Sequence, residues 1–331
     1  MDKARLLITG ANGFIGSFLA EKALLGGFDV YAGVRKNSNV SALSNLNISL
    51  VFLDYVNTEE LSAIFKQYNF THIIHNAGLT RTIVVQDYFK VNKDYLVNII
   101  SAVRSSNIQL SKFVFISSLA AFGPADFQES GIVKTNSIPH PVTNYGKSKI
   151  EAERYLTKQT DIPYIIIRPT AVYGPREKDL LNVFQLLNKR IEMYAGLIPQ
   201  KLTFIYVKDL VDVIILSLTS AIEKKAYFVT DGNVYTGEAF NGFIKESLNK
   251  RTLKLRLPIF LLQIVAFVLE KVTGFWDEYP PLNIDKVNEI KARNWNCDIQ
   301  DLKNDFGFIA KYDLTKGIPE TVAWYKEHKW L

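Results

Sequence analysis

Cysteine is almost missing from this sequence: Cys297 is the one example in 331 residues. A single cysteine cannot form a disulfide within the chain, which excludes the disulfide-stapled domains of many secreted proteins and fits a reducing compartment. The charged start, Met1–Arg5, leads directly into a strand pattern and shows no signal peptide. We therefore expect a cytoplasmic protein.

Histidine is also scarce, with four residues in the chain. Two of them, His72 and His75, fall within an expected strand and at its end. No cysteine or carboxylate cluster shares their spacing, and a metal centre would need such ligands. We therefore expect core or edge histidines and no metal site.

Long apolar runs are limited to one segment, Leu257–Leu269, which carries no charge. It is shorter than the about 20 residues that a membrane-spanning helix needs, so we expect no transmembrane segment. The pattern favours a helix of a substrate lobe, either buried or lining an apolar pocket. Interfacial membrane attachment, or a lid over an apolar substrate, is the alternative.

Clustered positive charge is absent as well. The net charge is +6, but lysine and arginine occur in ones and twos along the chain. A nucleic-acid-binding face would need them clustered, so we expect no nucleic-acid partner and a solvated surface with some attraction for an anionic cofactor. With 48% hydrophobic residues the chain can bury a large core.

A glycine turn follows the first apolar strand pattern, Leu6–Thr9, and opens a helical pattern. This context is the one that a dinucleotide-binding turn requires. Gly10 permits the tight turn, Gly13 lets the main chain approach a phosphate, and Gly16 lets the helix pack on the strand. The helix N-terminus adds N–H groups and partial positive charge. The predicted cofactor-binding residues here are Gly10, Asn12, Gly13, Phe14, Ile15 and Gly16. The alternative is a plain glycine-rich turn.

The second expected strand, Asp29–Val34, ends at Arg35 without a carboxylate. NAD enzymes commonly place an acid on the adenine ribose here, whereas an arginine accommodates the 2′-phosphate of NADP. Arg35 can hold that phosphate through paired hydrogen bonds. We therefore favour NADP(H) as the cofactor, with NAD(H) as the alternative. Arg35 could also be a solvated surface residue with no contact to a cofactor.

Polar and small residues follow the next two expected strands. Asp54 comes after Ile48–Leu53 and could accept a hydrogen bond from the adenine amino group. Asn76, Ala77 and Gly78 come after Thr71–Ile74 and offer small side chains beside a ribose. Ligands bind at the carboxyl ends of strands in open α/β sheets.

The fifth expected strand, Phe113–Ile116, leads into Ser117 and Ser118, and a helix downstream carries Tyr145 and Lys149. Tyrosine is a poor acid–base group at neutral pH. A lysine four residues along the same helix face can lower its pKa through its charge. A serine hydroxyl across the cleft can hold the substrate oxygen. The tyrosine–lysine spacing alone recurs by chance, but its place after the fifth strand makes chance a poor explanation.

These features together resemble the extended short-chain dehydrogenases/reductases, the NAD-dependent epimerase/dehydratase superfamily. The resemblance runs from Leu6 to about Trp330 and rests on these segments: Thr9–Gly16, His75–Gly78, Phe113–Ser118 with Gly123, Tyr145–Lys149, Arg168–Pro175 and Phe204–Asp209. It implies that Tyr145 is the general acid–base, that Lys149 holds the nicotinamide ribose and tunes the tyrosine, and that Ser118 orients the substrate oxygen. It also implies cofactor contacts by Ser117, Asn92, Pro169 and Val172.

The resemblance implies an NAD(P)-dependent oxidoreductase that interconverts a carbinol and a carbonyl on a small molecule. Arg35 is similar to the dihydroflavonol reductase and 3β-hydroxysteroid dehydrogenase-like branch. A nucleotide-sugar epimerase or dehydratase is the alternative, because the carboxyl-terminal segment of this chain is similar to that of many sugar-nucleotide members of the family. Leu202 stands where sugar-nucleotide epimerases usually show an arginine, and Ser118 lacks the acid pair of dehydratases. A non-catalytic dinucleotide-binding regulator is the second alternative, although such relatives often lose the tyrosine or lysine.

The alternating pattern predicts a doubly wound parallel sheet of the Rossmann type with a smaller, discontinuous C-terminal substrate lobe. We expect the dinucleotide-binding domain at 1–174 and 203–231 and the substrate lobe at 175–202 and 232–331. The polar stretch Phe127–Thr143 should form a loop over the site. Family members pair through the helix at about Gln86–Ser105 and the Tyr145 helix, so we expect a homodimer. Its apolar side chains Ile99, Ile100 and Val103 would serve that interface or face the sheet.

Overall fold

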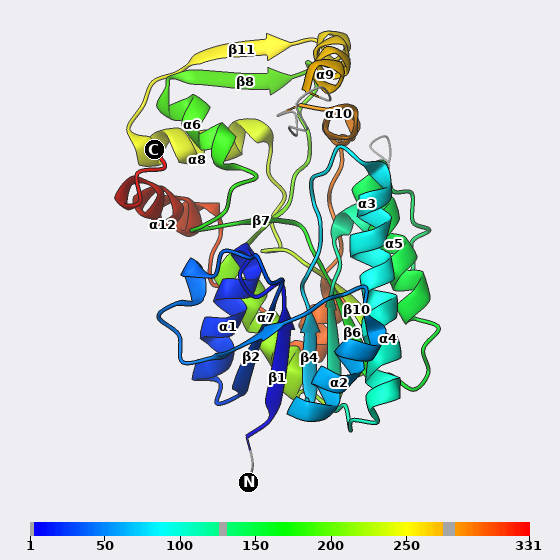
Figure 1. Cartoon of the computed structure of the whole chain (residues 1–331). Coiled ribbons are helices and arrows are strands. Elements are labelled where there is room, and N and C mark those ends of the chain that lie inside the picture. The colour runs from blue at the N-terminus through cyan, green and yellow to red at the C-terminus, as the bar shows by residue number, and fades with distance from the viewer. Residues whose placement is uncertain (1–2, 126–130, 274–281) are drawn as a thin grey trace.

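A computed structural model describes residues 3–125, 131–273 and 282–331. Within these ranges seven strands form one parallel sheet in the order β10-β6-β5-β4-β1-β2-β3 (Figure 1). The strands are β1 (Arg5–Thr9), β2 (Asp29–Val34), β3 (Ser49–Phe52), β4 (His72–His75), β5 (Lys112–Ile116), β6 (Tyr164–Pro169) and β10 (Lys225–Val229). The predicted doubly wound fold is confirmed.

The strand order reverses at β1, which is the point where such sheets bind ligands. Leu6 of β1 is in register with Val30 of β2 on one side and with His72 of β4 on the other. The chain adds β2 and β3 on one side of β1, then crosses to the other side and adds β4, β5, β6 and β10 there. The loops that follow β1 and β4 therefore begin side by side at the carboxyl edge.

Helices cover both faces of the sheet. One core cluster joins α1 (Phe14–Leu25) and α7 (Val207–Thr219) to the sheet, and the other joins α2 (Thr58–Tyr68), α4 (Tyr95–Ser106) and α5 (Asn144–Leu156). Ile99, Ile100 and Val103 are buried in the second cluster. They face the sheet, so they are not available to the homodimer interface, which itself stays a prediction.

The sequence explains where α2 begins and ends. Asn57 accepts a hydrogen bond from the Glu60 N–H at 3.1 Å, which satisfies one of the free donors of the first turn. Glu59 and Glu60 place negative charge at the positive end of the helix dipole. Asn69 ends the helix with a left-handed φ of 50°, a conformation that asparagine tolerates better than most residues.

A smaller lobe covers the carboxyl edge of the sheet (Figure 1). Its elements are α6 (Leu181–Asn188), β8 (Ile191–Ala195), α8 (Gly237–Leu248), β11 (Leu253–Leu257), α9 (Ile259–Thr273), α10 (Ile284–Lys291) and α12 (Leu314–Glu327). The parallel pair of β7 (Ala171–Tyr173) and β9 (Phe204–Tyr206) connects the sheet domain to this lobe. Its core is rich in aromatic rings, among which Phe204 and Phe240 stack at 4.7 Å between centroids. α11 (Gln300–Phe306) returns to the sheet beside β10.

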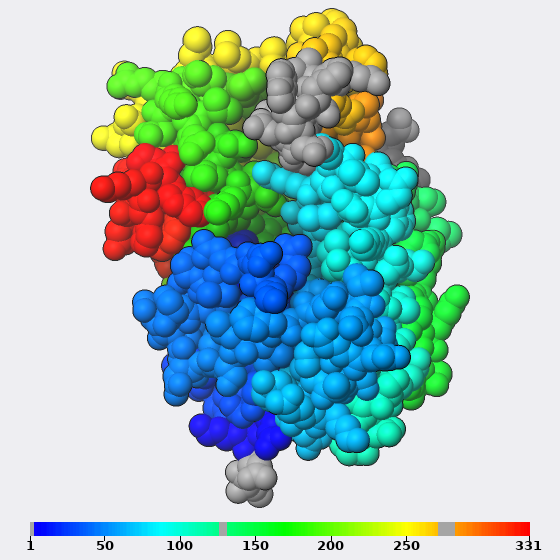
Figure 2. Space-filling view, in the orientation of Figure 1, coloured from blue at the N-terminus to red at the C-terminus, as the bar shows by residue number. Residues whose placement is uncertain are grey.

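The apolar segment Leu257–Leu269 forms most of α9, but the expectation that it is buried is wrong. Only Leu262 and Ala266 of this helix fall below 9% exposure among its described side chains. These two side chains pack on Val287 of α10, so they mark the face of α9 that lies against the lobe. The remaining turns lie at the surface, at the end of the molecule remote from the N-terminus (Figure 2). Within the described ranges no helix is long and apolar enough to cross a membrane.

Part of the predicted loop Phe127–Thr143, residues 126–130, lies outside the described residues. The remainder follows Gly123, whose φ of +80° and close approach to His140 require glycine, since an added Cβ would lie 2.1 Å from the His140 carbonyl oxygen. Val133 forms a bridge to Cys297. This segment is therefore tied to the chain near α11.

We expect Gly317→Ala in α12 to lower the free energy of unfolding. Helix propensity alone would favour alanine by about 1 kcal/mol. An added Cβ, however, would lie 2.3 Å from the Tyr173 hydroxyl, which donates to the Asp313 carbonyl at 2.8 Å. Overpacking of this kind costs about 1–3 kcal/mol, so urea unfolding should show a net loss.

Gly242→Ala in α8 is the matched control, because nothing lies within 4 Å of its added Cβ. It should raise the free energy of unfolding by about 0.5–1 kcal/mol. A gain at both positions would contradict the packing seen around Tyr173.

Candidate active site

The turn after β1 can be made only with glycine at two of its positions. Gly10 has φ +64°, and an added Cβ would lie 2.9 Å from the Cα of Ala77. A Cβ on Gly16 would lie 2.1 Å from the Gly10 carbonyl oxygen. Gly13 is the N-cap of α1 in an extended conformation, and Phe14 and Ile15 begin the helix. The first N–H groups of α1 therefore face the carboxyl edge without intrahelical partners, as an anion requires.

The Thr9 hydroxyl ties this turn to the loop after β4. Its oxygen accepts from the N–H groups of Asn76 and Ala77, both at 3.1 Å. It lies 2.9 Å from His75 Nδ1, so its proton goes to that nitrogen. Burial and the charge of Lys149 lower the pKa of His75 to about 3, which keeps the imidazole neutral as an acceptor. Asn76 adds a hydrogen bond to the Gly10 carbonyl at 3.3 Å.

Gly78, Asn92 and Lys149 meet immediately beyond this junction. An added Cβ on Gly78 would lie 3.1 Å from Asn92 Oδ1 and 3.2 Å from Lys149 Nζ. Asn92 lies in a π-helical turn, Lys90–Asp94, accepts from the Leu79 N–H at 2.8 Å and donates to Ser148 at 2.9 Å. Asn92 and Lys149 thus lie directly against the Gly78 backbone, where a side chain would crowd them.

Lys149 is buried, and its ammonium donates to the Ile116 carbonyl at 2.9 Å. Burial lowers the pKa of Lys149 to about 8, while the negative charge of Glu153 raises it. The ammonium also lies 5.0 Å from the centroid of the Phe115 ring. This lysine is held at the end of β5 in an environment that disfavours its charge.

Tyr145 lies one helical turn before Lys149 in α5, and Ser118 follows β5. Burial raises the pKa of Tyr145 to about 12, and a hydrogen bond with Ser118 lowers it less. The charges of Asp179 and Glu289 raise it further. The sequence predicted that Lys149 would lower this pKa; burial and two carboxylates instead raise it. The structure does bring Tyr145 and Ser118 together.

A buried ion pair that the sequence interpretation missed lies behind these residues. Arg168 Nη2 is 2.7 Å from Glu153 Oε2, and Arg168 Nε donates to both carboxylate oxygens at 3.1 Å. Ser117 donates its hydroxyl to Glu153, so its side chain is engaged in this pair. Removing one member of a buried pair is strongly destabilising. The four-residue spacing from Tyr145 to Lys149 to Glu153 places Glu153 on the same helix face, but nothing in the sequence points from it to Arg168 of β6.

The residues predicted for the adenosine end lie at the edge of the sheet near β2 and β3. Arg35 and Asp54 are exposed directly beyond these strands. Asn12 donates to the Asn39 carbonyl at 3.2 Å and so holds the loop after Arg35 against the glycine turn. Tyr55, which the sequence interpretation missed, is buried, and the neighbouring Thr9 side chain and Gly10 backbone partly offset the effect of burial, which raises its pKa.

The segment after β6 closes the other side of the site. Pro169 ends β6 and is buried, and Val172 lies half-buried in β7. Arg176, also missed, has φ +72°, lies 2.7 Å from Glu21 and donates to the Ser17 hydroxyl at 3.0 Å. It therefore fastens the start of the lobe to α1.

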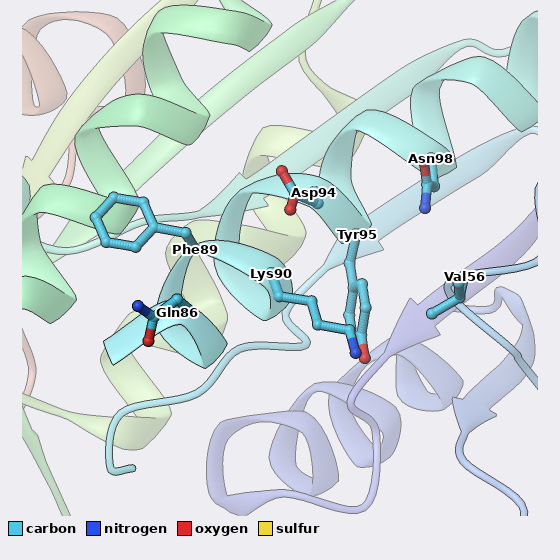
Figure 3. A pocket seen from close by; sticks show the side chains of 7 residues that line it. All are labelled: Val56, Gln86, Phe89, Lys90, Asp94, Tyr95 and Asn98. Atoms are coloured by element: carbon cyan, nitrogen blue, oxygen red, sulfur yellow. The ribbon is translucent and has the colours of Figure 1, made fainter. Parts of the chain in front are cut away.

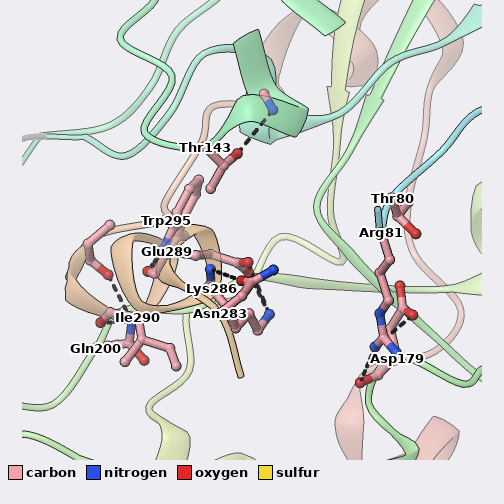
Figure 4. A network of polar contacts seen from close by, with 12 residues as sticks. Thr80, Arg81, Thr143, Asp179, Gln200, Asn283, Lys286, Glu289, Ile290 and Trp295 are labelled. Carbon is pink, nitrogen blue, oxygen red and sulfur yellow. Dashed lines mark hydrogen bonds and ion pairs between the residues drawn. The ribbon is translucent and has the colours of Figure 1, made fainter. Parts of the chain in front are cut away.

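Two polar contacts join the lobe to the sheet domain near Tyr145. Arg81 pairs with Asp179 at 2.9 Å (Figure 4). Asp285 of α10 accepts from the backbone N–H and the side-chain amide of Asn144, at 2.8 and 3.2 Å. The residue before Tyr145 is thus held by the lobe.

A surface pocket of about 560 Å³ lies on the outer side of α3 (Val85–Phe89) and α4 (Figure 3). It is lined by Val56, Gln86, Phe89, Lys90, Asp94, Tyr95 and Asn98. None of the predicted site residues is among them. Tyr95 stacks on Tyr55 at 4.9 Å between centroids. The pocket is therefore separate from Ser118, Tyr145 and Lys149.

The residues that are present fit a nicotinamide dinucleotide. Gly10 and Gly16 let the turn fold tightly on itself and on Ala77, which leaves the N-terminus of α1 at the carboxyl edge of the sheet. Gly78 brings its backbone close to the Lys149 ammonium. The pyrophosphate would lie at the first feature, and the nicotinamide ribose at the second.

The lowered pKa of Lys149 predicts a pH-dependent stability. The pKa of a free lysine is about 10.4, and that of Lys149 in the folded chain is about 8. Between these two pH values the unfolded chain therefore binds more protons than the folded chain. Its free energy of unfolding should rise with pH there. We expect the free energy of unfolding of the unmodified chain, minus that of Lys149→Met, to rise by about 2 kcal/mol from pH 7.5 to pH 9.5. Urea unfolding at the two pH values measures this.

Lys147→Met is the control, since Lys147 is exposed on the same helix. Its difference from the unmodified chain should not change with pH. A Lys149→Met difference that is equally flat would show that Lys149 keeps an ordinary pKa.

Comparison with known proteins agrees with this geometry. The model of the NAD dependent epimerase/dehydratase family matches residues 6–230. UDP-glucose 4-epimerase of Vibrio cholerae is 28% identical over 296 residues, which cover 81% of this chain and 85% of that protein. Ceramide reductase of Caulobacter vibrioides is 23% identical over 327 residues, covering 98% and 95%. Sterol-4-alpha-carboxylate 3-dehydrogenase of Dictyostelium discoideum is 23% identical, covering 95% and 99%.

Solved structures show the same fold. UDP-glucose 4-epimerase of Thermotoga maritima, with UDP-glucose, superposes with a TM-score of 0.81 at 20% identity, covering 98% of this chain and 99% of that one. dTDP-glucose 4,6-dehydratase of Bacillus anthracis, in complex with NAD, gives a TM-score of 0.78 at 19% identity, covering 98% and 97%. With the family match extending over the whole of the sheet domain, this chain belongs to the NAD-dependent epimerase/dehydratase family.

Proposed function

We propose that this chain is an NAD(P)-dependent oxidoreductase that interconverts a carbinol and a carbonyl on a small-molecule substrate. The observation that carries the proposal is that Ser118 lies at Tyr145, one helical turn from Lys149, and that the Lys149 ammonium lies beside the Gly78 backbone. Reductases and dehydrogenases among the relatives support this reaction class. Ser118, Tyr145 and Lys149 have the residue types and placement that proton transfer beside a hydride requires.

Bound nicotinamide supplies or accepts the hydride. In the reducing direction the Tyr145 hydroxyl donates its proton to the carbonyl oxygen of the substrate, and in the oxidising direction its oxygen takes that proton back. Ser118, which shares a hydrogen bond with Tyr145, holds the same substrate oxygen. The reacting oxygen thus has two hydroxyl partners, one for position and one for the proton.

Lys149 has two tasks in this proposal. Its ammonium now donates to the Ile116 carbonyl, at the end of β5. A nicotinamide ribose beside Gly78 would add hydroxyl oxygens within its reach. The positive charge would then favour the phenolate of Tyr145 and offset the burial that raises its pKa. The buried Glu153–Arg168 pair keeps a negative charge behind Lys149, which favours its charged form.

We infer NADP(H) as the preferred cofactor, with NAD(H) as the alternative. Arg35 is exposed at the end of β2, and the Asn12 contact to Asn39 holds the loop beside it. A guanidinium there can pair with a 2′-phosphate in two hydrogen bonds.

A nucleotide-sugar epimerase is the second candidate, favoured by the 28% identity to the Vibrio enzyme. An epimerase returns its hydride to the substrate, so it consumes no NAD(P)H in net terms. A reductase lowers NAD(P)H absorbance in step with product. This difference separates the two candidates for any substrate that is turned over.

Tyr145→Phe should lower turnover by about 10²–10⁴, the usual contribution of a positioned acid–base group, because it keeps the ring and removes only the hydroxyl. Cofactor affinity, measured by quenching of protein fluorescence, should change little. The assay follows NAD(P)H oxidation against a panel of long-chain, steroid and nucleotide-sugar ketones.

Tyr155→Phe, on the same helix, is the matched control and should keep full turnover. A Tyr145→Phe protein with unchanged activity on an identified substrate would overturn the acid–base assignment and favour the non-catalytic regulator.

Arg35→Ala should weaken NADP(H) binding about tenfold or more and leave NAD(H) binding nearly unchanged, since a charge-assisted contact contributes roughly 1.5–3 kcal/mol. Titration calorimetry with both cofactors measures this. Lys36→Ala, at the exposed neighbouring position, should have the smaller effect. Tighter binding of NAD(H) than NADP(H) by the unmodified chain would refute the preference.

A further inference from the structure

The outer side of α9 is an apolar surface. Besides Phe267, five apolar side chains of this helix are between 40% and 59% exposed: Phe260, Leu261, Ile264, Val265 and Val268. We call these five the α9 face. From Ile259 to Leu269 the helix has no charged residue. Isolated exposed apolar residues are ordinary, but a contiguous apolar face of this kind marks an interaction site.

The adjoining strand and loop extend this surface. In β11, Leu253 is 68% and Leu255 is 41% exposed. Leu255 is in register with Met193 of β8, which is 43% exposed. Leu197, in the loop after β8, is 81% exposed, and its carbonyl accepts from Arg256. These exposed side chains lie in, or directly after, two strands whose ends, at Ala195 and Leu257, pack against α9.

Positive charge borders the same surface. Residues 250–270 contain four basic residues, Lys250, Arg251, Lys254 and Arg256, and one acidic residue, Glu270. Arg256 pairs with Glu238 at 2.6 Å. The structure, over the residues it describes, gives Lys250, Arg251 and Lys254 no ion-pair partner. Apolar side chains inside a rim of free cations complement a bilayer with anionic head groups.

We propose that the α9 face and β11 dock on the surface of an anionic lipid bilayer, with α9 lying in the plane of the interface. α9 has 15 residues, a length of about 22 Å, and is too short to cross a hydrocarbon core of about 30 Å. It is long enough to place its apolar side chains among the acyl chains while Lys254 and Arg251 meet the phosphates. This docking goes beyond the proposed reaction and does not depend on it.

A second copy of the chain fits this surface less well. A symmetric dimer sets the same patch against itself. Lys250, Arg251 and Lys254 would then face the same cations of the partner copy, whereas a bilayer offers them negative charge.

The test is co-sedimentation of the full chain with vesicles. Vesicles of phosphatidylcholine and phosphatidylglycerol, three to one, should pellet the protein, and pure phosphatidylcholine vesicles should bind it several-fold less. Ile264→Asp should lower binding to the mixed vesicles at least tenfold. Lys254→Ala should lower it about fivefold, since each basic residue near an anionic surface contributes about that factor.

Ile309→Asp and Lys158→Ala are the matched controls. Ile309 is 82% exposed outside α9, and Lys158 is exposed in the sheet domain. Both should bind like the unmodified chain, and thermal unfolding should show that all four variants fold. Tyr145→Phe should also bind normally, which separates a failure of the proposed reaction from a failure of docking.

Absence of pelleting with mixed vesicles would overturn the proposal, as would equal binding of Ile264→Asp and Ile309→Asp. If sedimentation velocity instead showed a dimer that Ile264→Asp dissolves, with no vesicle binding, the surface would be an interface between copies.

Discussion

The structure depends on one close approach at the carboxyl edge of the sheet. The loops after β1 and β4 meet with so little space that Gly10 can carry no side chain, and within the first loop Gly16 is held as closely against the Gly10 carbonyl oxygen. The Thr9 hydroxyl fills all of its hydrogen-bonding positions in joining them. This contact fixes where α1 begins and aims its free N–H groups outward. It also brings the β4 loop, with Gly78, against Lys149 of a helix far along the chain.

Burial of charge is the second constraint on the site. Lys149 and the pair of Glu153 and Arg168 lie in the interior, where charges are costly unless compensated. The opposite charges of Glu153 and Arg168 offset the cost of their burial through three close contacts. Lys149 is compensated only in part, by one carbonyl and by the charge of Glu153. A chain selected for stability alone would place an apolar residue there, so this lysine is most easily explained by a task in the site.

The strands of the sheet could be predicted from the sequence because each is a short run of apolar residues bounded by glycine or polar residues. The limits of β2 were predicted to the residue, and those of β1, β3, β4 and β5 to within one. The glycine turn could also be predicted, since only glycine fits the close approaches at Gly10 and Gly16. The buried pair Glu153–Arg168 was not predicted, because a pairing between a helix and a strand leaves no local pattern.

The exposure of α9 could not be predicted for a related reason. An apolar segment has the same composition whether it packs inside a lobe or lies on its surface, and only the neighbours decide. Here α10 and β8 are small, and they cover one stripe of the helix. The pKa of Tyr145 was also misjudged, because the spacing of Tyr145 and Lys149 reveals their proximity and not the burial around them.

The contact of Asp285 with Asn144 connects two distant parts of the molecule. The carboxylate reaches from α10 to the first residue of the helix that carries Tyr145, and α10 itself packs on the buried side of α9. A continuous chain of contacts therefore runs from α9 through α10 to the start of α5. Thermodynamic linkage makes such a connection reciprocal. Whatever factor a contact at α9 imposes on occupancy of the cleft, occupancy of the cleft must impose on that contact.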